Sequence, residues 1–479
     1  MRRTRTTALA TLALLNVFTL AAGLVVVHML PPRLARLLIP VAATRPLIEA
    51  VPVLAPAVSS SAASLPTSTA LATMLGAALP AADAGPGVGI EVADARTGRV
   101  LYQDNASALA TPASTTKVVT AVASLAVLGP DARFTTTVRA EGNTVVLVGG
   151  GDPTLAVNKY PSSDYPQPAT LAALAAATAR ALKAKGRTSV TLGYDTSLYG
   201  GSGMAPGWSD SDISTGNVTP IVALEADQGR LTKTGTLEDD DDPVNFRSRT
   251  TDPVGMTVAA FASQLGRDGI TLTGTPAPVT AQASAPVLAS VSSPPLAAMV
   301  EQMLLESNNV IAENLARHVA LALGMPATFS GAADAVMTEA HRLGVTTPIS
   351  LVDGSGLSPQ DGIAPQTLVR VLAVAATTPR LRAAITSLPV AGFTGTLSAG
   401  DSDFGGIGAM ADGAARGVVR AKTGNLTTVA ALAGLAYDRD GSLLIFAIMA
   451  PHVPAAYLLQ NAADAIDSAA GGLADCGCR

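Results

Sequence analysis

Aromatic residues are scarce in this chain, since Phe, Trp and Tyr together account for 3% of its 479 residues. Charged residues are also few, at 14%, whereas hydrophobic residues reach 48%. Any core must therefore be filled by Ala, Val and Leu side chains rather than by aromatic rings. The length is sufficient for two or three domains with sizeable cores.

A strong excess of one charge is missing as well. The chain has 31 Lys and Arg against 36 Asp and Glu, which gives a net charge of −5. It contains no basic patch interleaved with aromatic residues, the pattern with which proteins neutralise phosphates and stack on bases. We therefore expect no nucleic-acid partner.

Cysteine occurs only at Cys476 and Cys478, without the second pair of ligands that a zinc site requires. Both residues belong to a short C-terminal tail, 471–479, in which we expect no catalytic role. Outside the membrane they can form a small disulfide ring. The acidic run Asp239–Asp242 is expected to be a solvated loop, so the sequence predicts neither a metal site nor a cofactor.

Charged residues are absent from the stretch 8–30, which follows Arg2, Arg3 and Arg5. This apolar stretch is long enough to cross a bilayer as a helix, and the preceding arginines orient it so that the rest of the chain is exported. We interpret residues 1–30 as a membrane anchor, with a cleaved signal peptide as the alternative. The rest of the chain is then expected outside the cytoplasm, in the cell envelope.

Residues 31–65 are rich in Pro, Ala, Ser and Val and predict a semi-extended spacer. After the spacer, apolar periodicity predicts helices, and apolar runs bounded by turn residues predict strands. The predicted helices cover residues 69–79, 110–129, 168–185, 254–267, 294–323, 331–343, 365–377 and 454–469. The predicted strands flank the turns Arg96–Gly98, Gly142–Asn143 and Asp440–Gly441 and include the sequences SVTLGYD and GVVRAKTG.

The order of these elements predicts the fold class. A helix and two strands come first, many helices follow, and three strands with a closing helix end the chain. This order predicts an α+β fold in which both ends of the chain complete one antiparallel sheet. Helices flank the sheet, and a helical subdomain packs on one face.

The stretch ATPASTTKVVTAVASLAVLG, residues 110–129, carries a serine and a lysine one helical turn apart, Ser114 and Lys117, and Pro112 favours a helix start there. A serine hydroxyl is a weak nucleophile that needs a neighbouring base. Lysine serves as that base only where burial and a helix N-terminus disfavour its ammonium form. The alternative is that Ser114 caps the helix and Lys117 reaches solvent, and the SxxK pattern by itself does not decide between them.

Two further motifs follow. ESNNVIAENL contains Ser307 and Asn309 as S-x-N between helical segments, and RAKTGNL contains Lys422, Thr423 and Gly424 on a strand. A glycine at this position permits close approach of another backbone. Each motif has a simpler interpretation, since the first can cap helix ends and the lysine of the second can be a solvated strand residue.

SxxK, SxN and KTG in this order resemble the signature of class C low-molecular-weight penicillin-binding proteins, the serine D-alanyl-D-alanine carboxypeptidases similar to penicillin-binding protein 4. The stretches GGGDPTL, YDTSLYGGSGMAPGW and LVDGSGLS strengthen the resemblance, which extends from about residue 70 to about residue 465. It implies a penicillin-binding transpeptidase-like catalytic domain formed by residues 66–134 and 291–470. An inserted α/β-type domain is expected at 135–290.

The resemblance implies a serine carboxypeptidase that acts on peptidoglycan stem peptides ending in D-Ala-D-Ala, and it leaves open whether the enzyme also cuts cross-links. Ser114 would attack the carbonyl of the penultimate D-alanine, with Lys117 taking its proton. Ser307 would relay a proton to the departing D-alanine, and Asn309 would hold the substrate amide and the lysine. β-Lactams mimic the dipeptide and are expected to inhibit the enzyme covalently at Ser114.

The remaining implied roles concern substrate binding. Lys422, Thr423 and Gly424 would bind the terminal carboxylate, with the lysine charge helping to keep the general base neutral. The backbone N–H groups of the nucleophilic serine and Asn425 would form the oxyanion hole. Asp195 matches a stretch that recognises the amino group of the third peptide residue in relatives, and ordinary anchoring of a loop is the alternative.

Two other functions use the same motifs. A serine β-lactamase would share them, but fast deacylation usually needs a placed carboxylate, and no ExxxN loop stands at a matching position. A non-catalytic envelope protein that binds β-lactams or muropeptides would keep the fold without turnover. Release of D-alanine, compared with hydrolysis of a chromogenic cephalosporin, separates these possibilities.

Overall fold

The computed structural model describes residues 65–161, 165–232, 247–398, 413–455 and 459–477. The predicted membrane segment 1–30, the acidic run Asp239–Asp242 and all but the last residue of the spacer 31–65 lie outside these ranges. Among the helices that these ranges contain, none is both long and apolar enough to cross a bilayer. In the C-terminal tail, Cys476 is disulfide-bonded.

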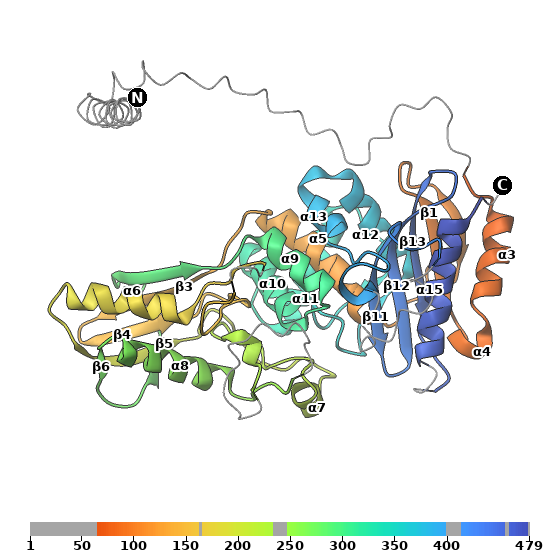
Figure 1. Ribbon diagram of the computed structural model, residues 1–479. Coiled ribbons are helices and arrows are strands. Elements are labelled where there is room, and N and C mark those ends of the chain that lie inside the picture. Colours follow the sequence, from red (N-terminus) through yellow and green to blue (C-terminus); the bar gives the residue numbers. More distant parts are fainter. Residues whose placement is uncertain (1–64, 162–164, 233–246, 399–412, 456–458, 478–479) are drawn as a thin grey trace, which may run out of the picture. The chain divides into compact units, whose positions relative to one another are not determined.

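A five-stranded antiparallel sheet joins the two ends of the described chain, as predicted (Figure 1). Its strand order is β11-β12-β13-β1-β2, so that the first hairpin adds to the last three strands through pairing of β1 with β13. Gly441 has a positive φ of 84° in the turn between β12 and β13, where a turn was expected. The strands are β1 (Gly89–Asp94), β2 (Val100–Asp104), β11 (Val419–Leu426), β12 (Val429–Tyr437) and β13 (Leu443–Ala450).

The central strands β12 and β13 are buried on both faces, which explains their nearly continuous apolar sequence. Leu432 and Phe446 point into one core, which α3 (Ser68–Ala78) and α15 (Leu459–Asp475) complete. Ala433 and Ala447 point into the other, which lies against α5 (Thr116–Leu128) and α12 (Pro365–Thr377). The sheet is therefore the middle layer between two sets of helices (Figure 1).

The helix α5 is the centre of the helical subdomain and is enclosed over most of its length, which suits its sequence of Val, Ala, Thr and Leu. The helices around it are α9 (Leu296–Leu305), α10 (Asn309–Ala322), α11 (Phe329–Arg342), α12 and the short α13 (Arg382–Thr386). Residues 306–308 interrupt the helical stretch predicted at 294–323. Asn308 ends this break, because its side-chain oxygen accepts a hydrogen bond from the N–H of Ile311 at the start of α10.

A second, six-stranded sheet is formed between α5 and α9 in the sequence. Its antiparallel strands are β3 (Thr135–Glu141), β4 (Thr144–Val148) and β8 (Val287–Ser292), and β5 (Ser189–Asp195), β6 (Thr271–Leu272) and β7 (Ala277–Pro278) add in parallel. The helices α6 (Leu171–Lys183) and α8 (Pro253–Arg267) pack with this sheet in a hydrophobic core of its own. That separate core supports the proposal that residues 135–290 form an inserted α/β-type domain.

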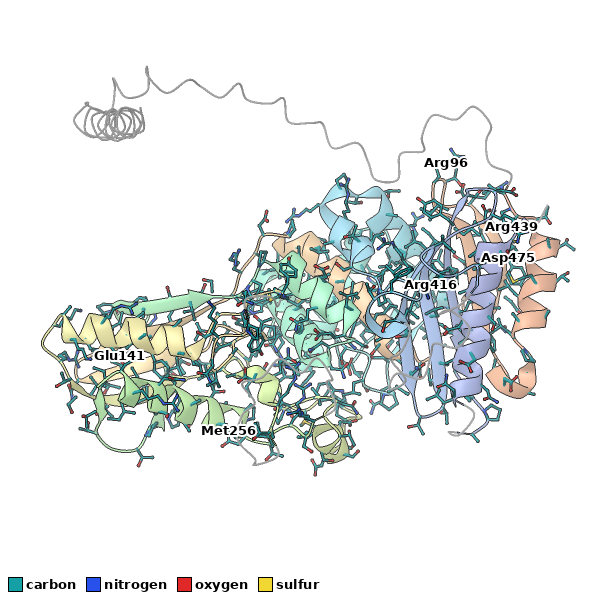
Figure 2. All side chains as sticks on the ribbon, viewed as in Figure 1. Arg96, Glu141, Met256, Arg416, Arg439 and Asp475 are labelled. Atoms are coloured by element: carbon teal, nitrogen blue, oxygen red, sulfur yellow. The ribbon has the colours of Figure 1, made fainter. Side chains whose placement is uncertain are left out.

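The charged side chains of Arg96, Arg439 and Asp475, labelled in Figure 2, are exposed. At one end of the first sheet, Arg439 in the β12–β13 turn forms an ion pair with Asp475 at the end of α15. Both side chains are more than half exposed, so the pair contributes little to stability. Stability instead depends on the apolar layers, where helix α5 lies innermost.

Replacing Leu125 of α5 by alanine is expected to destabilise the protein by about 3 kcal/mol, because this side chain is fully buried and its removal leaves a cavity. Leu109, which is 54% exposed, is the matched control, and Leu109→Ala should change stability by less than about 0.5 kcal/mol. Urea unfolding followed by circular dichroism measures both changes. Equal losses in the two variants would contradict the central position of α5.

Candidate active site

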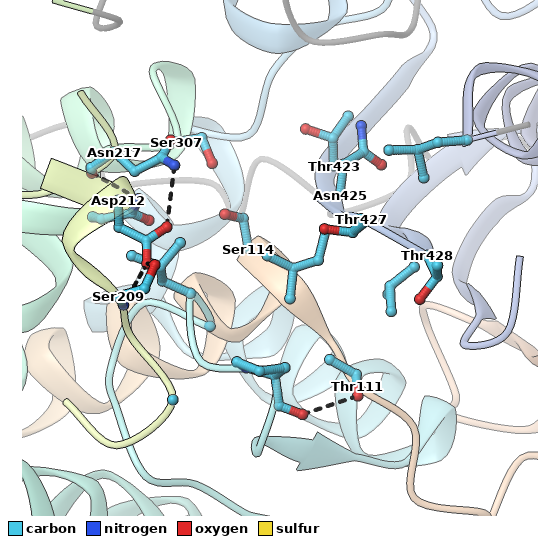
Figure 3. Close-up of a pocket in the computed structure, with 18 of the residues that line it drawn as sticks. Thr111, Ser114, Ser209, Asp212, Asn217, Ser307, Thr423, Asn425, Thr427 and Thr428 are labelled. Atoms are coloured by element: carbon cyan, nitrogen blue, oxygen red, sulfur yellow. Dashed lines mark hydrogen bonds between the residues drawn. The ribbon is translucent and has the colours of Figure 1, made fainter. Parts of the chain in front are cut away.

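A cavity of about 970 Å³ collects residues from segments that are far apart in the sequence. It is lined by the turn that leads into α5, the strand β11, the break between α9 and α10 and the segment 207–217 (Figure 3). The predicted site residues that line this one cavity are Ser114, Ser307, Asn309, Thr423 and Asn425. The structure thus brings the three motifs together.

The predicted nucleophile lies in a 3₁₀ turn, Ala113–Thr115, that leads into α5. Lys117 Nζ lies 2.8 Å from Ser114 Oγ, 2.6 Å from the side-chain oxygen of Asn309 and 2.8 Å from the carbonyl oxygen of Ser355. As an ammonium group, Lys117 donates to all three oxygens. As a neutral amine, it donates to Asn309 and Ser355 and accepts the proton of Ser114, which is the geometry a general base needs.

Burial decides the protonation state of this lysine. The side chain of Lys117 is fully enclosed, and desolvation lowers its pKa from 10.5 to about 7. The nearby carboxyl groups of Asp353, Glu313 and Asp361 act in the opposite direction and raise the pKa. A substantial fraction of the neutral amine is therefore present near neutral pH, and the alternative in which the lysine reaches solvent is wrong.

The S-x-N segment between α9 and α10 is held by hydrogen bonds to Asn217 and Gln228, which follow β5 in the part of the chain that forms the second sheet. Ser307 has a positive φ of 56°, and the side-chain amide of Asn308 donates a hydrogen bond of 2.8 Å to Gln228 Oε1. The side-chain amide of Asn309 donates to the carbonyl oxygen of Asn217 at 3.0 Å. These contacts leave the side-chain oxygen of Asn309 directed at the lysine.

Gly424 on β11 lies directly against the nucleophile segment, as its residue type predicts. A Cβ atom at this position would lie 2.6 Å from the carbonyl oxygen of Pro112 and 3.2 Å from the backbone nitrogen of Ser114. Any side chain would therefore push β11 away from the nucleophile. The next residue, Asn425, lines the cavity beside Ser114 (Figure 3).

The other two residues of the KTG motif differ in exposure to the cavity. Thr423 lines it, and its hydroxyl forms a 2.8 Å hydrogen bond with the hydroxyl of Thr396. Lys422 is fully buried, and its Nζ donates to the carbonyl oxygen of Thr423 at 2.9 Å. Burial first, and the charge of Lys117 second, lower the pKa of Lys422 well below its usual range. The alternative of a solvated strand lysine is therefore wrong.

The DGSGLS sequence forms the loop between the short paired strands β9 (Ile349–Ser350) and β10 (Gly362–Ile363). Asp353 fixes this loop, because its carboxylate accepts the N–H groups of Ser355, Gly356 and Ser358. It also accepts the indole N–H of Trp208 at 2.9 Å. The loop in turn presents the Ser355 carbonyl to the lysine.

Asp195 stands at the end of β5 and is not among the residues that line the cavity. Its carboxylate accepts the backbone N–H groups of Ser197 at 2.8 Å and Ala281 at 2.7 Å. These contacts are those of a loop anchor, the alternative that the sequence left open.

Several cavity residues had no motif to reveal them. Asp212 belongs to the capping box of the short helix α7 (Asp210–Ser214), whose S-x-x-D pattern is visible in the sequence but does not say that it faces the nucleophile. The others are polar or turn residues that tertiary packing alone brings to the cavity, and they are Thr111, Asn217, Glu306, Thr427, Thr428, His452 and Gln460.

Comparison with known proteins gives the same assignment as the motifs. A family model described as the D-Ala-D-Ala carboxypeptidase 3 (S13) family matches residues 72–234 and 225–471. Carboxypeptidase DacB of Mycolicibacterium smegmatis is 37% identical over 422 residues, which are 86% of this chain and 85% of that protein. A carboxypeptidase of Mycobacterium tuberculosis is 35% identical over 396 residues, 81% of this chain and 80% of that protein.

Among solved structures, the fold is similar to that of penicillin binding protein 4 from Haemophilus influenzae. The TM-score is 0.64 at 23% identity, with 79% of this chain and 92% of that chain covered. The same protein complexed with a β-lactam gives a TM-score of 0.57 at 24% identity over the same shares. The family model and the relatives cover most of the sequence, and the chain therefore belongs to the D-Ala-D-Ala carboxypeptidase 3 (S13) family.

Proposed function

We propose that this protein is a serine D-alanyl-D-alanine carboxypeptidase that removes the terminal D-alanine from peptidoglycan stem peptides. The observation that carries the proposal is the buried amine of Lys117, 2.8 Å from the hydroxyl of Ser114, at a cavity that Ser307 and Thr423 also line. The description of the matching family supports the same reaction.

In the proposed acylation step, Ser114 Oγ attacks the carbonyl carbon of the penultimate D-alanine while its proton passes to Lys117 Nζ. Asn309 and the Ser355 carbonyl accept the two hydrogens that the neutral amine keeps, so that its lone pair faces the hydroxyl. The backbone N–H groups of Ser114 and Asn425 are the proposed oxyanion hole. The product is an ester between Ser114 and the shortened peptide.

The leaving D-alanine needs a proton on its nitrogen and a partner for its carboxylate. We assign the proton relay from Lys117 to Ser307, and the carboxylate to Thr423 with Lys422 behind it. A substrate carboxylate at this place favours the ammonium form of Lys422, which burial and the charge of Lys117 disfavour. Water then hydrolyses the ester and frees Ser114.

β-Lactams are the proposed covalent inhibitors, because they present an acylating carbonyl and a carboxylate in the arrangement of the dipeptide. The solved complex of the Haemophilus influenzae protein with a β-lactam supports this proposal. A β-lactamase would instead need a carboxylate free to activate water at the ester. Of the two that line the cavity, Asp212 is engaged by Ser209 and Asn217, and burial raises the pKa of Glu306.

Cleavage of peptide cross-links is a second proposed activity, favoured by the extent of the cavity. It continues from Ser114 past Thr427 and Thr428 on one side and past Asp212 on the other, so peptide can extend in both directions (Figure 3). Incubation with a cross-linked muropeptide dimer, followed by chromatography, is expected to yield monomers. A dimer that persists while D-alanine is released would restrict the enzyme to carboxypeptidase work.

Peptidoglycan lies outside the cytoplasmic membrane, so the proposed substrate agrees with the export predicted from residues 1–30. We propose an extracytoplasmic location in the cell envelope, with that segment as membrane anchor or removed signal. Fractionation of cells that express the full chain, with N-terminal sequencing of the mature protein, distinguishes the two.

Ser114→Ala is expected to abolish covalent labelling by a fluorescent penicillin and to lower D-alanine release at least about a thousandfold, because the nucleophile is lost. Gel fluorescence and a D-alanine assay measure the two effects. Ser124→Ala, a serine of the same helix that is buried away from the cavity, is the control and should label normally. Labelling that persists in Ser114→Ala would assign the nucleophile elsewhere.

The acylation rate is expected to rise with pH through about 7 and then level off, because burial lowers the pKa of Lys117 to about 7 and only the neutral amine takes the serine proton. Penicillin labelling rates between about pH 5 and about pH 9 give this profile. Lys117→Arg keeps its proton over the whole range and should label at least about a hundredfold more slowly. A flat profile would mean that another group is the base.

A further inference from the structure

Three carboxyl groups lie enclosed behind the catalytic lysine, and the proposed mechanism does not use them. Glu313 and Asp353 have no exposed surface, and Asp361 is 3% exposed. Burying carboxyl groups is costly unless each has a defined set of partners. The function of Asp353 is the loop turn already described, and Asp361 accepts the N–H groups of Val352 and Asp353 in the same loop. Glu313 comes from another element, α10.

Glu313 lies one helical turn after Asn309, so the two side chains project from the same face of α10. Asn309 accepts a hydrogen bond directly from Lys117. The carboxylate of Glu313 instead accepts the backbone N–H of Gly354, at 3.0 and 3.1 Å to its two oxygens. The carbonyl of the next residue, Ser355, accepts from Lys117. Helix α10 therefore acts on the amine in two ways. Asn309 accepts a hydrogen bond from it directly, and Glu313 holds the loop whose Ser355 carbonyl accepts another.

The loop residue that links Glu313 to the lysine, Gly354, is tightly enclosed. A Cβ atom on Gly354 would lie 2.7 Å from the side chain of Ala316, so the loop packs directly on α10. On its other side, Thr120 of α5 donates a hydrogen bond of 2.6 Å to the carbonyl oxygen of Gly354. An N–H group in such a place has no access to water and requires a protein acceptor. Glu313 is that acceptor.

We propose that Glu313 is a positioning residue of the acylation reaction. It fixes the Asp353–Gly354 peptide and so places the following residue, Ser355, whose carbonyl holds the amine of Lys117 in line with Ser114. Its carboxyl charge also sets how readily that amine gives up its proton. The inference rests on the proposed role of Lys117 as general base. It assigns Glu313 no contact with substrate.

The charges around the lysine determine the sign of the second effect. Glu313 and Asp353 face Lys117 together with Asp361, and Lys422 faces it from β11. Burial and the charge of Asp353 raise the pKa of Glu313, although the hydroxyl of Ser355, the N–H of Gly354 and the charge of Arg317 act against this. Burial and the charge of Asp353 also raise the pKa of Asp361.

Glu313 and the lysine are close enough that the charge of the carboxylate affects the proton affinity of the amine. Ionised Glu313 raises the pKa of Lys117, because a negative charge favours the ammonium form. Removing that charge must lower the pKa of Lys117. The rising limb of the acylation profile then moves to lower pH.

The decisive variant is Glu313→Gln, which keeps an oxygen for the N–H of Gly354 but carries no charge. We expect its maximal rate of penicillin labelling to stay within about threefold of the parent, while the rising limb of the pH profile moves down by about one pH unit. Glu313→Ala removes the acceptor as well, so its maximal rate should fall by about tenfold or more.

Glu225→Gln is the matched control. Glu225 is also buried, and burial raises its pKa to about 8. It also accepts a hydrogen bond from α10, from the side-chain amide of Asn314 at 3.0 Å. It does not contact the loop that holds the lysine. The same chemical change at this position should leave the rising limb in place. Thermal melting of all three variants shows whether each is folded.

An unmoved limb in Glu313→Gln, or the same shift in Glu225→Gln, would overturn the charge effect. A folded Glu313→Ala that acylates as fast as the Gln variant would overturn the positioning role. If the Ala variant does not fold, the maximal rate of the Gln variant decides, because a fall of about tenfold with the acceptor still in place would contradict that role. Neither result affects the proposed function, which would fail only if labelling did not depend on Ser114.

Discussion

A lysine side chain enclosed in a protein core is costly as an ammonium ion, and the organisation of this site follows from that cost. The fall in the pKa of Lys117 from 10.5 to about 7 corresponds to about 5 kcal/mol of lost preference for the charged form. Three oxygen atoms, from Ser114, Asn309 and Ser355, form hydrogen bonds with the amine. Each comes from a different segment, so the amine functions only when all three segments are in place.

The segment of the chain that forms the second sheet takes part in this arrangement through Asn217 and Gln228. Its Gln228 and Asn217 hold Asn308 and Asn309, and without them the break between α9 and α10 would lose these two hydrogen bonds. The cavity is therefore lined both by the nucleophile segment and β11 and by the segment 207–217, which follows β5 in the sequence. The proposed inserted domain, residues 135–290, therefore supplies partners for one of the three motifs.

Much of this was predictable from the sequence because it depends on local patterns. Strands β11 to β13 and helix α5 follow from apolar runs and turn residues, and Gly424 indicated a close backbone approach that the structure confirms. Residues whose role depends on tertiary packing were not predictable. The Ser355 carbonyl carries no side-chain signal, and Glu313 has the spacing of an ordinary helix residue. Asp195 matched a sequence stretch, but its carboxylate is taken up by two backbone N–H groups.

The left-handed backbone at Ser307, with φ of 56°, has a thermodynamic consequence. A non-glycine residue pays about 1–2 kcal/mol for this conformation, and here the bond between Asn308 and Gln228 opposes its relaxation. A ligand in the cavity that stabilises the left-handed conformation of Ser307 must, by reciprocity, also stabilise the hydrogen bond between Asn308 and Gln228. Backbone amides around residue 228 should then exchange with deuterium more slowly in the acylated enzyme than in the free one, at a distance from the bond that was formed.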